Sequence, residues 1–255
     1  MGFDLEAVRI TALPEDAFYI SDFITEDEED WLLQEVNSAP LPRWTQLSHR
    51  RLQTWPSALT KSNALLGSPL PAWLRSPIVE PGFEALGIFN DAPHRAPNHV
   101  LVNEYQPGQG IMPHEDGAAY YPLVATVSLG APIVLDVYHK YTQNCRAESS
   151  TPAKVGRDVA GIPGTNRRPQ YRILQERRSL LITRGKMYTD LLHGIEETTR
   201  DEDLGPHSIC NWELLREKEL YQSGWYERKT RTSLTYRDVL HVVKMGNTFR
   251  LLGGR

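Results

Sequence analysis

The pattern of apolar and polar positions changes near the middle of the chain. After Pro97 the apolar residues gather in short runs that are rich in β-branched and aromatic side chains and are bounded by Pro, Gly or Asn. Such runs are typical of β-strands. They lie at 99–105 (HVLVNEY), 120–129 (YYPLVATVSL), 132–138 (PIVLDVY), 178–184 (RSLLITR) and 231–239 (RTSLTYRDV). The C-terminal half is therefore expected to be mainly β, a sandwich or jelly roll with flanking helices packed outside it.

The N-terminal half carries helical signals instead. Residues 18–40 are typical of a strand followed by a helix, because Thr25 and Glu28 have the spacing of a capping box. We expect a buried apolar stripe on this helix, formed by Trp31, Leu32 and Val36. We expect a solvated, acidic first turn, formed by Glu26, Asp27, Glu28 and Glu29. A second helical region, from Pro69 to Asp91, is expected in pieces because Pro77 and Pro81 interrupt it.

A long basic stretch separates two of the expected strands. Residues 139–178 hold nine Lys or Arg against three acidic residues, a net charge of +6, which leaves −4 − 6 = −10 for the rest of the chain. A loop of this length inside a compact domain is usually either functional or disordered. We expect it to be an insertion that could clamp a phosphate backbone.

Length and composition favour one intracellular domain. A chain of 255 residues with 40% hydrophobic residues can bury one substantial core. Cys145 and Cys210 are too few for a disulfide framework and have no zinc-type spacing, which favours a reducing compartment. The first ten residues do not resemble a signal peptide, and no run reaches the length of a membrane span. We therefore expect a soluble monomer in the cytoplasm, the nucleus or both.

Three residues have the chemistry of a metal site. His114 and Asp116 would project from the same side of an extended strand, and His193 returns 79 residues later in the strip LLHGI. Two imidazoles and one carboxylate form the facial triad of non-haem iron(II) oxygenases, and zinc is the chemical alternative. On spacing alone, His193 could equally be a core histidine bonded to a backbone carbonyl.

Two strand faces suggest a site for an anion. Asn103 and Tyr105 share one face of their strand, and Arg231 and Arg237 share one face of theirs with Ser233 and Thr235. Two arginines that face a barrel interior need an anion, and a dicarboxylate fits their forked donors. The alternative is a row of arginines facing solvent on an edge strand.

These strips, in this order, resemble a known family. NEYxPGxGIxPHxD, VSLG, LLHGI and RxSLTxR look like the AlkB family of iron(II)/2-oxoglutarate dioxygenases, and the runs EYQPGQGIMPHEDGAAYYP and LLHGI look most like its homologue six group. The resemblance covers residues 18–239. It implies a double-stranded β-helix and a single domain over 1–255, with a helical, nucleotide-lid-like extension at 18–98. The jelly-roll core would span 99–245 and carry the basic insertion 139–178.

The resemblance also implies roles for individual residues. His114, Asp116 and His193 match the iron(II) ligands, so the cosubstrates would be 2-oxoglutarate and O2. The matching 2-oxoglutarate contacts are Arg231, Tyr105 and Ser233 at the distal carboxylate, and Arg237 and Asn103 near the carboxylate at the metal. The family more often has asparagine where Ser233 stands. The 38 residues from His193 to Arg231 also exceed the spacing in the bacterial prototype.

The expected reaction is oxidative demethylation of alkylated bases in DNA or RNA. The strip PRWTQLSHRRLQTW mixes basic and aromatic residues suited to phosphate contact and base stacking, namely Arg43, Trp44, Arg50, Arg51 and Trp55. A basic surface turn with two core tryptophans explains the same strip. Two other functions stay open: a protein hydroxylase or demethylase, and a nucleic-acid-binding protein with a weak or vestigial site.

Other residues near these motifs are weaker candidates. His99, His207 and His241 could each replace His193 as the third ligand, but His207 lacks the leucine-rich strand that frames His193. Glu115 should face away from the metal and contact solvent if its strand is extended.

Overall fold

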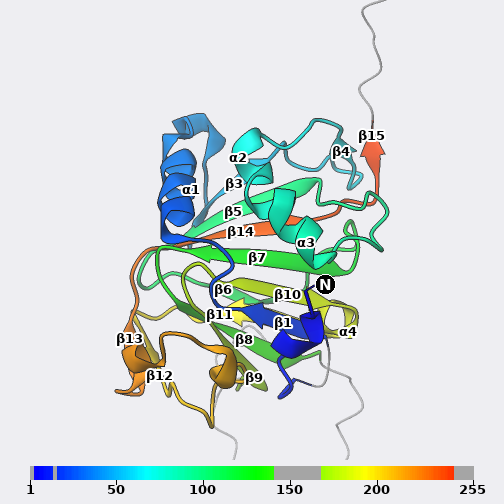
Figure 1. Ribbon diagram of the computed structural model, residues 1–255. Helices are drawn as coiled ribbons and strands as arrows, with labels where there is room; N and C mark the ends of the chain where they lie inside the picture. The colour runs from blue at the N-terminus through cyan, green and yellow to red at the C-terminus, as the bar shows by residue number, and fades with distance from the viewer. Residues whose placement is uncertain (1–2, 14–15, 141–167, 244–255) are drawn as a thin grey trace, which may run out of the picture.

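Two facing antiparallel sheets form the body of the molecule. The computed structural model describes residues 3–13, 16–140 and 168–243. The larger sheet has seven strands in the order β1-β10-β7-β14-β5-β3-β2 (Figure 1). Their bounds are β1 Ala17–Ile20, β10 Leu180–Arg184, β7 Leu123–Leu129, β14 Arg231–Arg237, β5 His99–Tyr105, β3 Arg51–Trp55 and β2 Thr45–Gln46.

The smaller sheet has four strands in the order β6-β11-β8-β9. They are β6 Ile111–His114, β11 Leu191–Ile195, β8 Ile133–His139 and β9 Tyr171–Gln175. The chain passes repeatedly between the sheets, because β6, β8 and β11 belong to the smaller sheet while β7, β10 and β14 belong to the larger. This alternation gives the double-stranded β-helix and confirms the predicted jelly roll.

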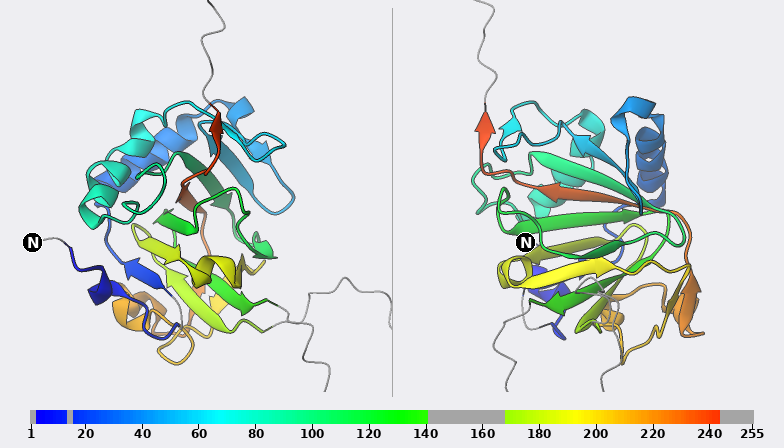
Figure 2. Two further views of the ribbon diagram at one scale, coloured as in Figure 1. Left: turned by 90° about the vertical axis from the view of Figure 1, so that its right-hand side faces the viewer. Right: turned by 180° about the vertical axis from the view of Figure 1, so that it is seen from behind.

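Helices cover one face of the larger sheet. Figures 1 and 2 show α1 Glu26–Ser38, α2 Ala72–Arg75 and α3 Glu84–Leu86 together on that side of the molecule. Their buried residues, which include Leu32 and Leu74, share one core cluster with Val100 and Val102 of β5. The predicted helical pieces between Pro69 and Asp91 are confirmed.

The alternation along β5 and β14 directs polar residues to the other face of the larger sheet. Val100 and Val102 pack against the helices, while Leu101, Asn103 and Tyr105 line a cavity between the sheets. In the same way, the alternate residues of β14 that line this cavity are Arg231, Ser233, Thr235 and Arg237. Both predicted faces are confirmed, since neighbouring side chains on a strand point in opposite directions.

The start of α1 is partly as predicted. Thr25 and Glu28 form the capping box in both directions. However, Trp31 is 40% exposed, so its place in the buried stripe is wrong, and Leu32 and Val36 form the stripe instead. Glu29 is fully buried rather than solvated. Successive helical residues differ by about 100° in direction, which turns Trp31 away when Leu32 faces the sheet.

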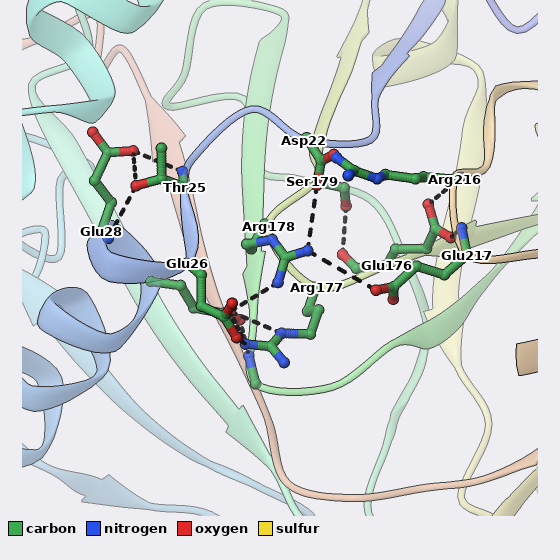
Figure 3. Close-up of polar contacts among 12 residues, drawn as sticks. Asp22, Thr25, Glu26, Glu28, Glu176, Arg177, Arg178, Ser179, Arg216 and Glu217 are labelled. Carbon is green, nitrogen blue, oxygen red and sulfur yellow. Dashed lines mark hydrogen bonds and ion pairs between the residues drawn. The ribbon is translucent and has the colours of Figure 1, made fainter.

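Ion pairs explain how Glu29 can be buried. Its carboxylate accepts hydrogen bonds from the Gly130 backbone N–H at 2.7 Å and from Arg177 Nε at 2.8 Å. Arg178 lies beside it and reaches Asp22 and Glu217 (Figure 3). A buried carboxylate is tolerated when it is paired and hydrogen-bonded. The network therefore fastens α1 to the loop between β9 and β10.

The prediction of one long loop over 139–178 is wrong at its C-terminal end. Residues 171–175 form β9, which pairs with β8. Arg172 at this end is 3.4 Å from the Asp136 carboxylate, and Arg177 and Arg178 belong to the network around Glu29. These three arginines are therefore occupied by acidic partners of the chain. The rest of the predicted basic insertion, 141–167, lies outside the described residues.

The remaining elements are short. The segment 18–98, expected as an extension, contributes β2 and β3 and most of β1 to the larger sheet. Two-stranded pairs join β12 Arg200–Glu202 to β13 Trp225–Glu227, and β4 Leu65–Leu66 to β15 Val242–Val243. The short helical turns are η1 Leu5–Val8, η2 Leu41–Arg43, η3 Ile78–Phe83, α4 Lys186–Thr189, η4 Trp212–Leu214 and η5 Lys218–Tyr221. Within the described ranges, no helix has the length and apolar character needed to cross a membrane.

Candidate active site

Strand pairing brings the predicted metal ligands together. β11 pairs with β6 so that His193 lies opposite His114, with ring centroids 4.5 Å apart. β6 ends at His114, so Asp116 reaches the site from the following loop and not from the extended strand that we predicted. One ligand atom from each of His114, Asp116 and His193 lies within 4.8 Å of the others. These atoms can hold one metal ion.

The surroundings of the triad suit a metal. His114 Nδ1 lies 3.0 Å from the Met112 carbonyl oxygen, and this contact orients the ring. Burial lowers the pKa of His193 to about 4, and therefore favours the neutral imidazole that binds a metal. Arg237 Nη2 donates to Asp116 Oδ1. The donor set fits iron(II) and leaves coordination positions for other ligands.

The triad opens on a cavity of about 320 Å³ between the two sheets. Strand register sets its polar floor, since Asn103 on β5 lies opposite Ser233 on β14 and both line the cavity. Tyr105 lies opposite Arg231 in the next cavity-facing row. The cavity therefore runs from Arg231 at one end of β14 to Arg237 and the triad at the other.

Arg231 provides a buried positive charge at one end of the cavity. It is 2% exposed, and its Nη2 donates to Ser128 Oγ at 2.8 Å and to Gln175 Oε1 at 3.1 Å. Burial lowers its pKa to about 10. Its Nε has no hydrogen-bond partner, and no described carboxylate forms an ion pair with it. This arginine fits the distal carboxylate of a dicarboxylic acid, and the alternative of a solvent-facing arginine row is wrong.

Arg237 lies at the metal end of the cavity. Its Nε and Nη1 have no hydrogen-bond partner, while its guanidinium lies 5.1 Å from the Tyr120 ring centroid. Arg237 lies opposite His99 in the register, and the side-chain oxygen of Asn103 instead accepts from Arg50 Nε at 3.3 Å. The joint role of Arg237 and Asn103 at the metal-bound carboxylate stays a prediction.

The predicted substrate residues divide into two groups. Arg50 lines the cavity. Arg43 covers the Trp55 ring and Arg51 covers the Trp44 ring, each with its guanidinium carbon 4.0 Å from the ring centroid. Arg51 also forms a bidentate pair with Glu104, at 2.7 Å for both bonds. Arg43, Trp44 and Arg51 therefore stiffen the edge of the larger sheet, and their contact with substrate stays a prediction.

The alternative histidines do not join the triad. His99 is buried, its Nε2 lies 3.2 Å from the Ser57 carbonyl oxygen, and burial lowers its pKa to about 4. His207 and His241 are exposed, and His207 pairs with Asp203. Among the described residues, the single group of three metal-binding side chains is therefore the predicted one.

Several cavity residues were not predicted as functional. Tyr120 and Tyr188 line the cavity near Asp116, and the Tyr188 hydroxyl donates to the Gly117 carbonyl oxygen at 2.8 Å. Gln175 was hidden inside the stretch expected to be a loop. Ser128 does not line the cavity but bonds to Arg231 beside it, and it lies within the VSLG strip, which marked its position but not its contact. Glu115 is exposed, as predicted, and pairs with Lys140, but it also lines the cavity instead of facing away from it.

Several known proteins resemble this chain. A zebrafish (Danio rerio) protein named "Probable RNA/DNA demethylase ALKBH6" is 39% identical over 94% of this chain and 93% of its own length. A Xenopus tropicalis protein named "tRNA (carboxymethyluridine(34)-5-O)-methyltransferase alkbh8" is 26% identical over 93% of this chain, which spans about a third (34%) of that protein. The solved structure of OsALKBH1 aligns at 13% identity with a TM-score of 0.49, covering 89% of this chain and 98% of that one.

A family model completes these comparisons. The model of the 2OG-Fe(II) oxygenase superfamily matches residues 16–237, a span that includes both sheets, the triad and both cavity arginines. Members of this family use iron(II), 2-oxoglutarate and dioxygen, which agrees with the donor set and the unpaired arginine described above. The chain therefore belongs to the 2-oxoglutarate- and iron(II)-dependent oxygenase superfamily and is a dioxygenase.

Proposed function

We propose that this dioxygenase removes methyl groups from alkylated bases of RNA or DNA. The observation that carries the proposal is the joint lining of one cavity by the metal-binding triad and the unpaired Arg231. This cavity occurs in a chain 39% identical to a protein named as a probable RNA/DNA demethylase. The cavity explains the oxidative chemistry, and the relative's name supports the substrate class.

Each end of the cavity would hold one part of the cofactor and cosubstrate pair. His114, Asp116 and His193 would bind iron(II). Arg231, Tyr105 and Ser233 would hold the distal carboxylate of 2-oxoglutarate, while Arg237 and Asn103 would lie near its other end. The neutral His193 and the Arg237 contact to Asp116 keep the triad ready to bind the metal. We also propose that the protein acts as a monomer in the cytoplasm, the nucleus or both.

The proposed reaction balances without a protein nucleophile. When bound, iron(II) and 2-oxoglutarate supply the activation of dioxygen. One oxygen atom enters the N-methyl group to give N-hydroxymethyl, and the other enters succinate as 2-oxoglutarate loses carbon dioxide. The N–C bond of the hydroxymethyl group then breaks to release formaldehyde and restores the N–H of the base.

The cavity mouth has residues suited to a flat, anionic substrate. Tyr120 and Tyr188 provide aromatic surface near Asp116, and Arg50 provides a positive charge on the cavity wall. Aromatic rings can stack on bases, and arginine can contact phosphate. On a duplex, the target base would have to leave the stack to reach the metal.

A succinate assay tests the proposal. The iron-loaded protein is incubated with 2-oxoglutarate and a panel of methylated oligonucleotides and peptides, and succinate and formaldehyde are measured for each. We expect both products to rise with at least one methylated oligonucleotide and not with its unmethylated form. If no oligonucleotide raises succinate above the level of protein alone, the proposal is wrong.

The same panel separates the other two functions. Turnover on peptides, with no response to nucleic acid, would identify a protein hydroxylase or demethylase. Tight, salt-dependent binding of RNA or DNA that survives His114→Ala, without succinate release, would identify a binding protein with a vestigial site. Arg50→Gln should raise KM for the oligonucleotide, whereas Arg75→Gln, an exposed change on α2, should not.

A further inference from the structure

Gln175 is a buried polar residue of the cavity that no known motif assigns. It ends β9 in the smaller sheet, is 2% exposed and lines the cavity. Its Oε1 accepts hydrogen bonds from Arg231 Nη2 at 3.1 Å and from Ser128 Oγ at 3.4 Å. The residue therefore links the smaller sheet to the arginine at the end of the cavity on the larger sheet.

The chemistry of Arg231 fixes the orientation of the Gln175 amide. A guanidinium can only donate, so the amide oxygen has to be the atom that faces it. The amide nitrogen Nε2 then keeps two N–H donors, and no described residue accepts a hydrogen bond from them. Nε2 is not fully enclosed by protein atoms, so it contacts open space in the cavity.

Ser128 completes a closed ring of three hydrogen bonds. Its Oγ accepts from Arg231 Nη2 and donates to Gln175 Oε1. The ring holds Nη2 of Arg231 in one place and leaves its Nε without a protein partner. The unused Nε2 donors of Gln175 are thus held beside the Arg231 guanidinium at the same end of the cavity.

We propose that Gln175 is a determinant of cosubstrate specificity, whose Nε2 donates a hydrogen bond to the distal carboxylate of 2-oxoglutarate while its Oε1 positions Arg231. A neutral amide suits this place because it orients the arginine without neutralising it. The proposal rests on the assignment of Arg231 to the distal carboxylate and does not depend on which substrate is oxidised.

Glutamate at position 175 would have almost the same shape as glutamine but would disfavour binding of the distal carboxylate. A carboxylate could accept the same two hydrogen bonds from Arg231 and Ser128. It would also pair with the arginine charge, remove the N–H donors and repel an incoming dicarboxylate. A hydrogen bond to a charged group contributes enough that its loss alone should weaken binding by about tenfold or more.

Equilibrium binding to the full-length protein tests the proposal without turnover. Isothermal titration calorimetry on the Mn(II)-loaded protein, without oxygen, gives dissociation constants for 2-oxoglutarate and for 2-oxovalerate, which lacks the distal carboxylate. In Gln175→Glu we expect the dissociation constant for 2-oxoglutarate to rise by about tenfold or more, and that for 2-oxovalerate to change by less than about threefold. Gln170→Glu adds the same charge at an exposed position on the same segment and should change neither constant.

Three results would overturn the proposal. The first is an unchanged dissociation constant for 2-oxoglutarate in Gln175→Glu. The second is an equal weakening for both acids, which would indicate general damage to the cavity. The third is wild-type discrimination between the two acids in Gln175→Met. This variant keeps the side-chain volume and provides the test if Gln175→Glu does not fold.

A separate variant tests the underlying assignment. Arg231→Met should abolish the preference for 2-oxoglutarate over 2-oxovalerate. If that preference survives, the assignment of Arg231 to the distal carboxylate is wrong and the role of Gln175 is overturned with it. Because no nucleic acid is present in these titrations, a failure of the demethylase proposal would leave their results unaffected.

Discussion

Asp136 should make the protein less stable as the pH rises. This residue lies on β8, opposite Gly194 in the register with β11, and is 5% exposed. Burial raises the pKa of its carboxyl from 3.8 to about 6, although Arg172 at 3.4 Å opposes the shift. The carboxylate form is therefore disfavoured in the folded protein, and Asp136→Asn should remove that penalty.

The sign and size follow from proton linkage. Between these two pKa values the folded state binds more protons than the unfolded state, so stability is fully present below pH 3.8 and is lost as the pH rises through about 6. The shift of about 2 pKa units corresponds to a loss of about 3 kcal/mol in the free energy of unfolding. About 1.4 kcal/mol of this is lost between pH 5 and pH 8. Asp136→Asn should lack this part of the pH dependence.

Urea unfolding at pH 5 and pH 8 measures the difference. The free energy of unfolding of Asp136→Asn minus that of the wild type should be larger at pH 8 than at pH 5 by about 1.4 kcal/mol, because the variant keeps the stability that the wild type loses. Asp91→Asn, at an exposed position, should show no such change. Equal pH dependence in the wild type and Asp136→Asn would refute the claim that burial of this carboxylate destabilises the fold.

Three further substitutions test other parts of the structure. Glu29→Gln removes the buried charge between two arginines and should lower the free energy of unfolding, measured in urea, by about 2 kcal/mol, whereas Asp30→Asn, at an exposed position, should not. Equal stability of the two variants would contradict a stabilising role for the ion pairs of Glu29. Without 2-oxoglutarate, Arg231→Met should raise the free energy of unfolding by up to about 3 kcal/mol, because burial lowers the pKa of this arginine to about 10. A lower free energy of unfolding would show that the hydrogen bonds of Arg231 outweigh the cost of its desolvation. Tyr188→Phe removes the hydrogen bond to the Gly117 carbonyl oxygen and should weaken Mn(II) binding about tenfold in a chelator competition, whereas Tyr138→Phe should not. Unchanged affinity would mean that this hydrogen bond does not position Asp116.

Local patterns in the sequence were sufficient for the strands of the core and for the residues they direct inward. The period of two along residues 99–105 and 231–237 predicted which side chains enter the cavity, because a strand has only two faces. The capping box at Thr25 and Glu28 was predicted for a similar reason, since its bonds join residues three positions apart. The order of the motifs along the chain also identified the family, which the comparisons confirm.

The tertiary structure decided which polar residues have partners. Arg43 and Arg51 looked like free phosphate contacts, but Arg43 covers the Trp55 ring, and Arg51 covers the Trp44 ring and binds the Glu104 carboxylate. Glu29 looked solvated, yet its arginines are about 150 residues away (148 for Arg177). Gln175 looked like part of a loop, because a five-residue strand flanked by charges gives only a short alternating signal.

The division follows the range of the interactions. Strand faces and helix caps depend on residues within a few positions of one another, so the sequence alone determined them. The partner of a charged side chain, the cavity end closed by the Arg231, Ser128 and Gln175 ring, and the approach of Asp116 from a loop depend on strands that are distant in the sequence. Only the packing of the two sheets sets the distances between these groups, and those distances determine the electrostatic environment of each one.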